Sequence, residues 1–274
     1  MKHPEFAAVG YLCFDTNVYP DKTERRVGGG AYFASQAASL VLDQVGLVTR
    51  VGQEFPSEVL HPRVRREGVT YSALPTMETK LVYRSEDLSH RDVYPNWGAS
   101  IELEAEHFPL EWLMSVQMVL LSTMEPTQQA RILQQLRERA PHLQIAVDSS
   151  EFFVTNSATR DQVAQNYLNA DLVFANRHEY AGLQFVFSDV PRAVVKFDGD
   201  GAQYMERGKV VSRLPAPEVE AIDVTGAGDV FAGTFLSYLI TGESQESALG
   251  LAIARASLSV TQSGIEHLFS ASHR

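Results

Sequence analysis

The feature that most constrains this chain is the seven-residue stretch Asp223–Asp229 (DVTGAGD), which is followed by an apolar run of helix length. Glycine and alanine leave the backbone uncovered, so its N–H groups can approach a ligand closely. A helix that begins here directs its unpaired N–H groups and the positive end of its dipole at that ligand. The stretch therefore predicts a site for an anion, and the usual biological anion is a phosphate group.

Asp229 falls in the first turn of this expected helix. A carboxylate in that place is stabilised in its charged form, so it can accept a proton at neutral pH. An anion site beside a carboxylate is what phosphoryl transfer to a hydroxyl group requires. Two other interpretations stay open, which are a plain glycine-rich loop before a buried helix and a dinucleotide-binding fingerprint. The second needs a preceding strand, and residues 215–222 make a poor one.

The same stretch resembles the D-T-x-G-A-G-D signature of the ribokinase-like (phosphofructokinase-B type) carbohydrate kinases. The resemblance implies that ATP donates the phosphoryl group and that Mg²⁺ assists. It also implies roles for five residues, with Asp229 as the catalytic base, the amides of Gly226, Ala227 and Gly228 as the anion hole, and Thr225 in the nucleotide site.

Two candidates for substrate binding lie near the N-terminus. Residues 6–12 read as a buried first strand, and Asp15 follows it. Open α/β sheets bind ligands at the carboxyl ends of their strands. Taken alone, Asp15 is more often a turn former. The family resemblance implies instead that Asp15 binds sugar hydroxyls, and Asn17 is a weaker candidate for the same role.

A run of glycines, Gly28–Gly30, precedes a pattern of apolar residues at helical spacing. Glycines before a helix permit close approach to a ligand, although a flexible loop is the plainer interpretation. The run resembles the family's G-G-x-x-x-N substrate motif, which implies that Gly29 and Gly30 bind substrate. Phe33 stands where the family often has Asn, and this form resembles the inositol kinase branch. The departure makes a polyol or cyclitol substrate credible.

Asn176 and Glu179 open another expected helix. Asn176 is a good N-cap and Glu179 follows three residues later, so a capping box alone explains the pair. The pair also resembles the family's N-x-x-E motif, which implies that both side chains hold Mg²⁺, largely through water.

Residues 193–202 read as a strand, a turn and a strand, and they resemble a family segment near the ATP phosphates. Lys196 replaces a frequent Thr there and is suited to pair with phosphate as a point charge. Gly201 lies in the turn and is assigned to the nucleotide site with it. Asp198 replaces the first glycine of the family segment, so we expect the local backbone to differ. Asp148 follows another strand and is a further candidate to face the site.

The order of the elements predicts a mostly parallel sheet with helices on both faces. The resemblance implies a single ribokinase-like domain over 1–274, a three-layer α/β/α fold with a small β lid built from residues of about 13–27 and 69–97. A hairpin is expected from residues 80–84 and 91–94, with a polar loop at 85–90. Further strands are expected at 45–51, 116–122, 143–147 and 170–174, and helices at 56–66, 126–139 and 247–261.

The composition of the chain limits the kinds of partner that we expect the protein to bind. The formal net charge of −11 argues against nucleic acid and against an anionic membrane surface. Cys13 is the single cysteine, so an intrachain disulfide is impossible and a reducing, cytoplasmic location is expected. Residues 1–5 lack the apolar segment of a signal peptide, and no run of about 18 apolar residues exists, so no membrane partner is expected. We expect a monomer, or a homodimer that pairs through the edge of the lid.

These observations predict an ATP-dependent kinase that requires Mg²⁺ and phosphorylates a hydroxyl of a small sugar or cyclitol. Three alternatives stay open. They are a nucleoside kinase of the same family, a catalytically silent protein that binds sugar or nucleotide, and a dehydrogenase that uses the glycine fingerprint.

Overall fold

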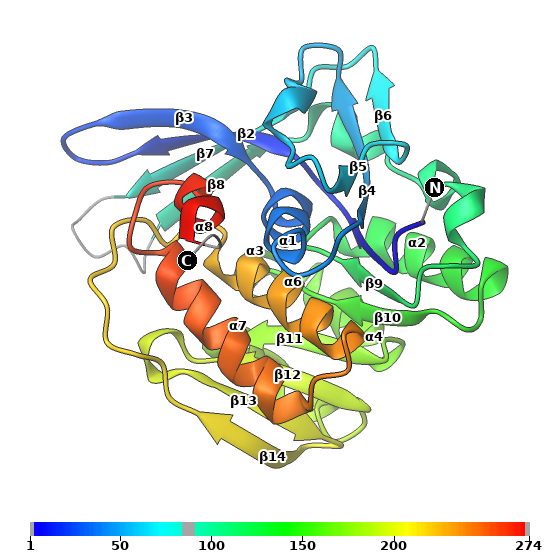
Figure 1. Cartoon of the computed structure of the whole chain (residues 1–274), viewed down its shortest axis with the longest axis vertical. Coiled ribbons are helices and arrows are strands. Elements are labelled where there is room, and N and C mark those ends of the chain that lie inside the picture. Colours follow the sequence, from blue (N-terminus) through cyan, green and yellow to red (C-terminus); the bar gives the residue numbers. More distant parts are fainter. Residues whose placement is uncertain (1–2, 84–90, 272–274) are drawn as a thin grey trace.

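A large sheet forms the centre of the computed structural model, which describes residues 3–83 and 91–271. Ten strands of this described part join in the order β14-β13-β12-β11-β10-β9-β1-β4-β5, with β6 paired to β4 (Figure 1). Neighbouring strands run parallel except at one edge, where β13 pairs antiparallel with both β12 and β14. The strands are β1 Phe6–Val9, β4 Val45–Gly52, β5 Val64–Arg65, β6 Val69–Ser72, β9 Met118–Leu121, β10 Gln144–Val147, β11 Leu172–Asn176, β12 Arg192–Lys196, β13 Ala202–Glu206 and β14 Lys209–Leu214.

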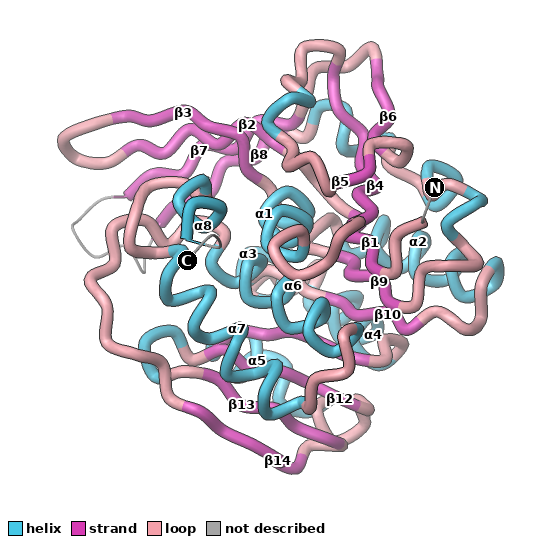
Figure 2. Tube along the Cα trace, in the orientation of Figure 1, coloured by secondary structure: helices cyan, strands magenta, loops and turns pink. Residues whose placement is uncertain are grey.

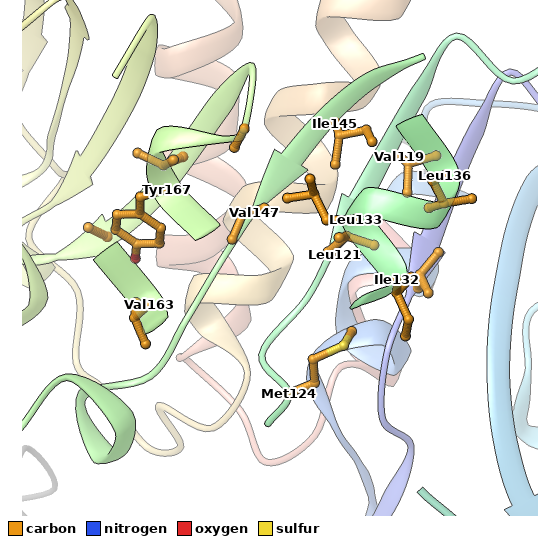
Figure 3. Close-up of a cluster of buried hydrophobic side chains, with 14 of the residues drawn as sticks. Val119, Leu121, Met124, Ile132, Leu133, Leu136, Ile145, Val147, Val163 and Tyr167 are labelled. Carbon is orange, nitrogen blue, oxygen red and sulfur yellow. The ribbon is translucent and has the colours of Figure 1, made fainter. Parts of the chain in front are cut away.

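Helices cover both faces of the large sheet. Successive residues of a strand point to opposite faces. Val119 and Leu121 of β9 therefore join the apolar core on one face, whereas Leu120 joins the core on the other. Figure 3 shows the first core, where side chains of α2 and α4 pack over β9 and β10. The helices of that face are α2 Pro126–Arg139, α3 Glu151–Val154, α4 Arg160–Leu168 and α5 Arg177–Leu183, and those of the other are α1 Gly30–Ala38, α6 Ala227–Ile240, α7 Gln245–Ser259 and α8 Glu266–Ala271.

A second, four-stranded sheet extends to one side of the three layers (Figure 2). It consists of two antiparallel hairpins joined by a parallel pair between β2 and β7. The predicted hairpin is confirmed by the pairing of β7 with β8, and the predicted polar loop 85–90 lies outside the described residues. The strands are β2 Cys13–Val18, β3 Thr23–Gly28, β7 Met77–Tyr83 and β8 Arg91–Asn96.

Two predictions for the chain after β4 are wrong. Residues 56–66 form a 3-10 turn at Ser57–Val59 and the short strand β5 instead of an α-helix. Pro62 lies between them, and proline both lacks an N–H donor and restricts the residue before it. Residues 69–72, which were assigned to the lid, form β6 and pair with β4 in the large sheet.

The first strand is also shorter than predicted. β1 ends at Val9, and the chain then enters the small sheet at Cys13. Asp15, which follows β1 in the chain as predicted, therefore lies within a strand of the small sheet and not in a loop directly after β1. In the described part of the chain, no helix has the length and apolar character needed to cross a membrane.

Candidate active site

The glycine-rich stretch begins α6, as the sequence predicts. Gly226 is the N-cap residue, with φ 76° and ψ 0°, in the left-handed region that favours glycine. The amides of Asp229 and Val230 both donate to the Gly226 carbonyl, at 3.0 and 2.8 Å. The Ala227 amide donates to Val224 O over a long 3.3 Å. The loop thus presents a helix N-terminus with Asp229 in its first turn, and its role as an anion hole stays a prediction.

Phe33 packs against this loop. Its side chain is only 3% exposed, and a Cβ added to Gly226 would lie 2.3 Å from its ring. Tyr32 contacts the ring of Phe33 edge-on, with 5.3 Å between the ring centroids. Phe33 therefore fixes the backbone at Gly226 and offers no hydrogen bond to a substrate. This packing explains Phe33 without any reference to a cyclitol, and the inositol-like substrate stays a prediction.

Two carboxylates lie against the glycine run before α1. A Cβ on Gly28 would lie 1.8 Å from Asp15 Oδ2, and a Cβ on Gly30 would lie 2.7 Å from Asp229 Oδ1. Gly29 between them is the N-cap of α1 and has φ 100°, which also favours glycine. The fold therefore brings together Asp15, Gly29, Gly30 and Asp229, which the sequence nominated from opposite ends of the chain.

Thr225 lies where the glycine-rich loop meets the small sheet. Its Oγ1 is 3.4 Å from both Asn17 Nδ2 and the Tyr83 hydroxyl. Tyr19 stacks on Tyr83, with 4.8 Å between ring centroids and 10° between planes. Asn17 is fully buried, and within the described residues its Oδ1 has no hydrogen-bond partner. Because a buried acceptor without a partner destabilises the protein, Asn17 is suited to accept a hydrogen bond from a bound hydroxyl.

Tyr19 also lies at this candidate site, with its hydroxyl 3.4 Å from Asn17 Nδ2, and the sequence motifs did not nominate it. The alternation along β2 places Asp15 and Asn17 on one face of the strand, and Tyr19, which follows the end of β2, continues the same period of two in the sequence. That period of two was the available signal.

Lys196, at the end of β12, lies beside the glycine-rich loop. Its Nζ is 2.9 Å from Asp148 Oδ2, and a Cβ on Gly228 would lie 3.1 Å from the same Nζ. Burial opposes the charge of Lys196, but Asp148 and Glu179 outweigh it and raise the pKa of Lys196. Lys196 is therefore held as a cation beside the loop, where phosphate binding stays a prediction. Asp148 is buried in this ion pair, and burial raises the pKa of Asp148 against the opposing effect of Lys196.

Asn176 and Glu179 form a complete capping box at the start of α5, which confirms the structural interpretation of the pair. Asn176 Oδ1 accepts from the amides of His178 and Glu179 at 2.9 and 2.8 Å. The Glu179 carboxylate accepts from Asn176 N at 2.8 Å and from Asn176 Nδ2 at 3.0 Å. Burial, together with Asp148, raises the pKa of Glu179 to about 7.

These bonds decide how well the pair suits a metal ion. Both Glu179 oxygens and Asn176 Oδ1 are engaged within the capping box, and the charge of Glu179 is disfavoured. Among the described residues, no three His, Cys, Asp or Glu side chains gather into a ligand set. Asn176 Oδ1 already accepts two hydrogen bonds and does not fit a directly bound Mg²⁺ ion, whereas each Glu179 oxygen accepts one bond and keeps a second acceptor position. Contact through water stays a prediction.

Gly201 shapes the turn between β12 and β13. It has φ 92°, and a Cβ there would lie 2.0 Å from the Leu214 carbonyl oxygen. Asp198 has φ 54°, a left-handed conformation that aspartate tolerates better than most residues. The turn thus has glycine-like backbone at both positions, although only one of them is glycine. A nucleotide-binding role for Gly201 stays a prediction.

The dinucleotide interpretation lacks the context that it needs. Its fingerprint must follow a strand that leads into the helix. β14 ends at Leu214, and residues 215–225 reach α6 without a strand.

Comparison with known proteins identifies the family. Residues 5–270 match the model of the pfkB family of carbohydrate kinases. The chain belongs to this family. It is therefore an ATP-dependent kinase of the group that acts on sugars and nucleosides.

Two relatives match almost the whole chain. A cytidine kinase of Thermococcus kodakarensis is 26% identical over 271 residues, which cover 92% of this chain and 94% of the relative. A nucleoside kinase of Methanothermobacter thermautotrophicus is 24% identical over 289 residues, which cover 96% of this chain and 91% of the relative.

The structure of adenosine kinase from Sinorhizobium meliloti superimposes with a TM-score of 0.80 at 19% identity, covering 95% of this chain and 94% of that one. This likeness confirms the ribokinase-like α/β/α fold and carries no information on the substrate.

Proposed function

We propose that this kinase transfers a phosphoryl group from ATP to a hydroxyl of a ribose-containing nucleoside or a similar small sugar. One observation carries the proposal, which is that Asp15 and Asp229 both lie against Gly28–Gly30. A carboxylate can accept hydrogen bonds from two neighbouring hydroxyls. Asp15 would thus orient a diol, while Asp229 would face the hydroxyl that reacts. The names of the relatives, cytidine kinase and nucleoside kinase, favour a nucleoside.

In this proposal each residue has a separate task. Asp229 accepts the proton of the attacking hydroxyl. The amides of Gly226, Ala227 and Gly228 stabilise charge on the transferring group at the N-terminus of α6. Lys196 adds a positive charge next to Gly228, and Asn17 accepts a hydrogen bond from the substrate through Oδ1. Alignment of the reactants supplies much of the rate enhancement in reactions of this type.

Mg²⁺ neutralises phosphate charge in most kinases. Because the capping box engages Asn176 and Glu179, we propose that such an ion is held mainly by phosphate oxygens and water, and that this pair contributes only through water.

The proposal is tested by measuring ADP release from ATP and Mg²⁺ with a panel of nucleosides, pentoses, hexoses and cyclitols. We expect turnover with nucleosides or pentoses and a loss of kcat of about 10²- to 10⁴-fold in Asp229→Asn, since that is the usual contribution of a general base. Asp161→Asn is the matched control, because Asp161 also lies in the first turn of a helix, α4, and is exposed.

The other outcomes separate the alternatives. Turnover confined to cyclitols would replace the proposed substrate class with the one that Phe33 first suggested. Undiminished turnover in Asp229→Asn would show that another group accepts the proton. ATP binding without turnover on any acceptor would favour a silent binding protein.

A further inference from the structure

Arg26 of β3 forms a largely buried ion pair with the first residue of the glycine-rich stretch. Its Nη1 lies 2.8 Å from Asp223 Oδ2. The side chain of Asp223 is 4% exposed and that of Arg26 is 19% exposed, so water screens this pair weakly. A strand of the small sheet is thereby bound to the loop that precedes α6.

Asp223 also forms hydrogen bonds with the backbone of the loop itself. Its Oδ1 accepts a hydrogen bond from the Thr225 amide at 3.0 Å, and its Oδ2 also accepts from the Gly264 amide at 3.3 Å. The Asp223 amide donates to the Val260 carbonyl at 3.2 Å. The carboxylate thus fixes the backbone one residue before Gly226, where the proposed anion hole begins.

The second nitrogen of the guanidinium reaches a third segment. Arg26 Nη2 donates to Ser263 Oγ at 2.7 Å and also pairs with Glu24. Ser263 lies in the turn between α7 and α8, which Figure 1 shows beside the small sheet. The planar fork of an arginine suits such a junction, because it donates in several fixed directions at once. Arg26 therefore joins the small sheet, the loop before α6 and the turn after α7.

We infer that Arg26 is a positioning residue for phosphoryl transfer, which orders the loop from Asp223 to Gly228 and couples it to the small sheet. The inference rests on the proposed function. Asp15, Asn17 and the stacked tyrosines belong to the small sheet or its turns, whereas Asp229 and the amides belong to α6. Arg26 is an ionic link between these two halves of the site, and its side-chain contacts are to Asp223, Glu24 and Ser263.

The neighbouring Arg25 provides a matched control. It lies on the opposite face of the same strand and pairs with Glu78 at 2.7 Å. Both side chains of that pair are more than half exposed, at 56% and 52%, and an exposed pair contributes little. Arg25→Gln therefore removes the same charge from the same strand without disturbing the loop.

The experiment compares Arg26→Gln, Arg26→Lys and Arg25→Gln in the full chain, with the substrate found by the panel. We expect kcat to fall by about tenfold to a hundredfold in Arg26→Gln, since a small misplacement of reacting groups has effects of that order. The KM for the acceptor should change much less than kcat. Arg26→Lys, which keeps the charge but loses the fork, should recover part of the rate, and Arg25→Gln should behave as the unchanged protein.

Hydrogen exchange of residues 223–230, measured without substrate, gives a readout that does not depend on activity. We expect faster exchange in Arg26→Gln and no change in Arg25→Gln, while circular dichroism shows that both variants are folded. If the unchanged protein phosphorylates no acceptor, the proposed function fails but exchange still tests the role of Arg26. Unaltered kcat and unaltered exchange in folded Arg26→Gln would overturn the inference.

Discussion

The contact between Gly226 and Phe33 yields the sharpest prediction of stability. Gly226→Ala introduces a Cβ at φ 76°, where a side chain costs about 1–2 kcal/mol. That Cβ would also lie 2.3–2.6 Å from three atoms of the Phe33 ring. Overpacking of a well-packed site costs roughly 1–3 kcal/mol more. We therefore expect Gly226→Ala to lower the free energy of unfolding by about 2–5 kcal/mol.

Two other glycines separate the two contributions. Gly242 has φ 91° with no atom within 4 Å of an added Cβ, so Gly242→Ala meets only the cost of the backbone conformation. Gly199 has neither a left-handed φ nor a close neighbour, so Gly199→Ala meets neither cost. Urea unfolding of the three variants should rank Gly226→Ala as most destabilising, Gly242→Ala next and Gly199→Ala last.

A double-mutant cycle with Phe33→Ala isolates the steric overlap between the added Cβ of residue 226 and the Phe33 ring. Phe33→Ala alone should cost about 3–5 kcal/mol, because it leaves a cavity in the core. In that background Gly226→Ala should cost only the backbone contribution, which gives a coupling energy of about 1–3 kcal/mol. A coupling energy of zero, or equal losses in Gly226→Ala and Gly242→Ala, would refute the reasoning that Phe33 fixes the loop.

Two further predictions concern the buried charges. The pKa of Glu179 is raised from an ordinary 4.5 to about 7 in the folded state. This shift contributes about 3 kcal/mol of stability below about pH 4.5, and the contribution is lost as the pH rises through 7. Glu179→Gln should therefore flatten the dependence of the unfolding free energy on pH from 5 to 8, whereas Glu138→Gln on the exposed side of α2 should leave the slope unchanged. Lys196→Met should lower the free energy of unfolding by roughly 3–5 kcal/mol at pH 8, because it leaves Asp148 buried without its cation. Adding Asp148→Asn to the same chain should restore most of that loss, as measured by urea unfolding.

The layers of the fold could be predicted because local patterns determine them. The helix 126–139 has its predicted bounds in α2, with a proline at the first position and the Glu125 side chain capping two amides. The start of α6 was also predicted correctly, from its glycines. Helix α4 was not predicted, since its sequence is mostly polar and its buried Asn166 is satisfied by distant partners, the Pro126 carbonyl and Gln129 Oε1. Such partners are invisible in a local window.

The candidate site also has residues that the sequence could predict and contacts that it could not. The resemblance to family motifs nominated Asp15, Gly30 and Asp229, and the structure places both carboxylates against the glycine run. It could not reveal the pairing of Arg26 with Asp223, because 197 residues separate the two and no local pattern specifies that contact. The capping box of Asn176 and Glu179 was predictable from their spacing and is confirmed, whereas the metal-binding role that the family resemblance implies for them stays a prediction.

Three glycines of this site are explained by the charged side chains that lie against them. A Cβ on Gly28, Gly30 or Gly228 would meet Asp15, Asp229 or Lys196 respectively, at 1.8, 2.7 and 3.1 Å. Each glycine therefore lets a charged side chain approach the backbone closely, and the three charges surround the start of α1 and α6. A protein that only bound sugar would need the diol contacts proposed for Asp15, but it would have no use for a second carboxylate and a cation held beside a helix N-terminus. The arrangement is what proton removal and phosphate charge require together, so it favours catalysis over silent binding.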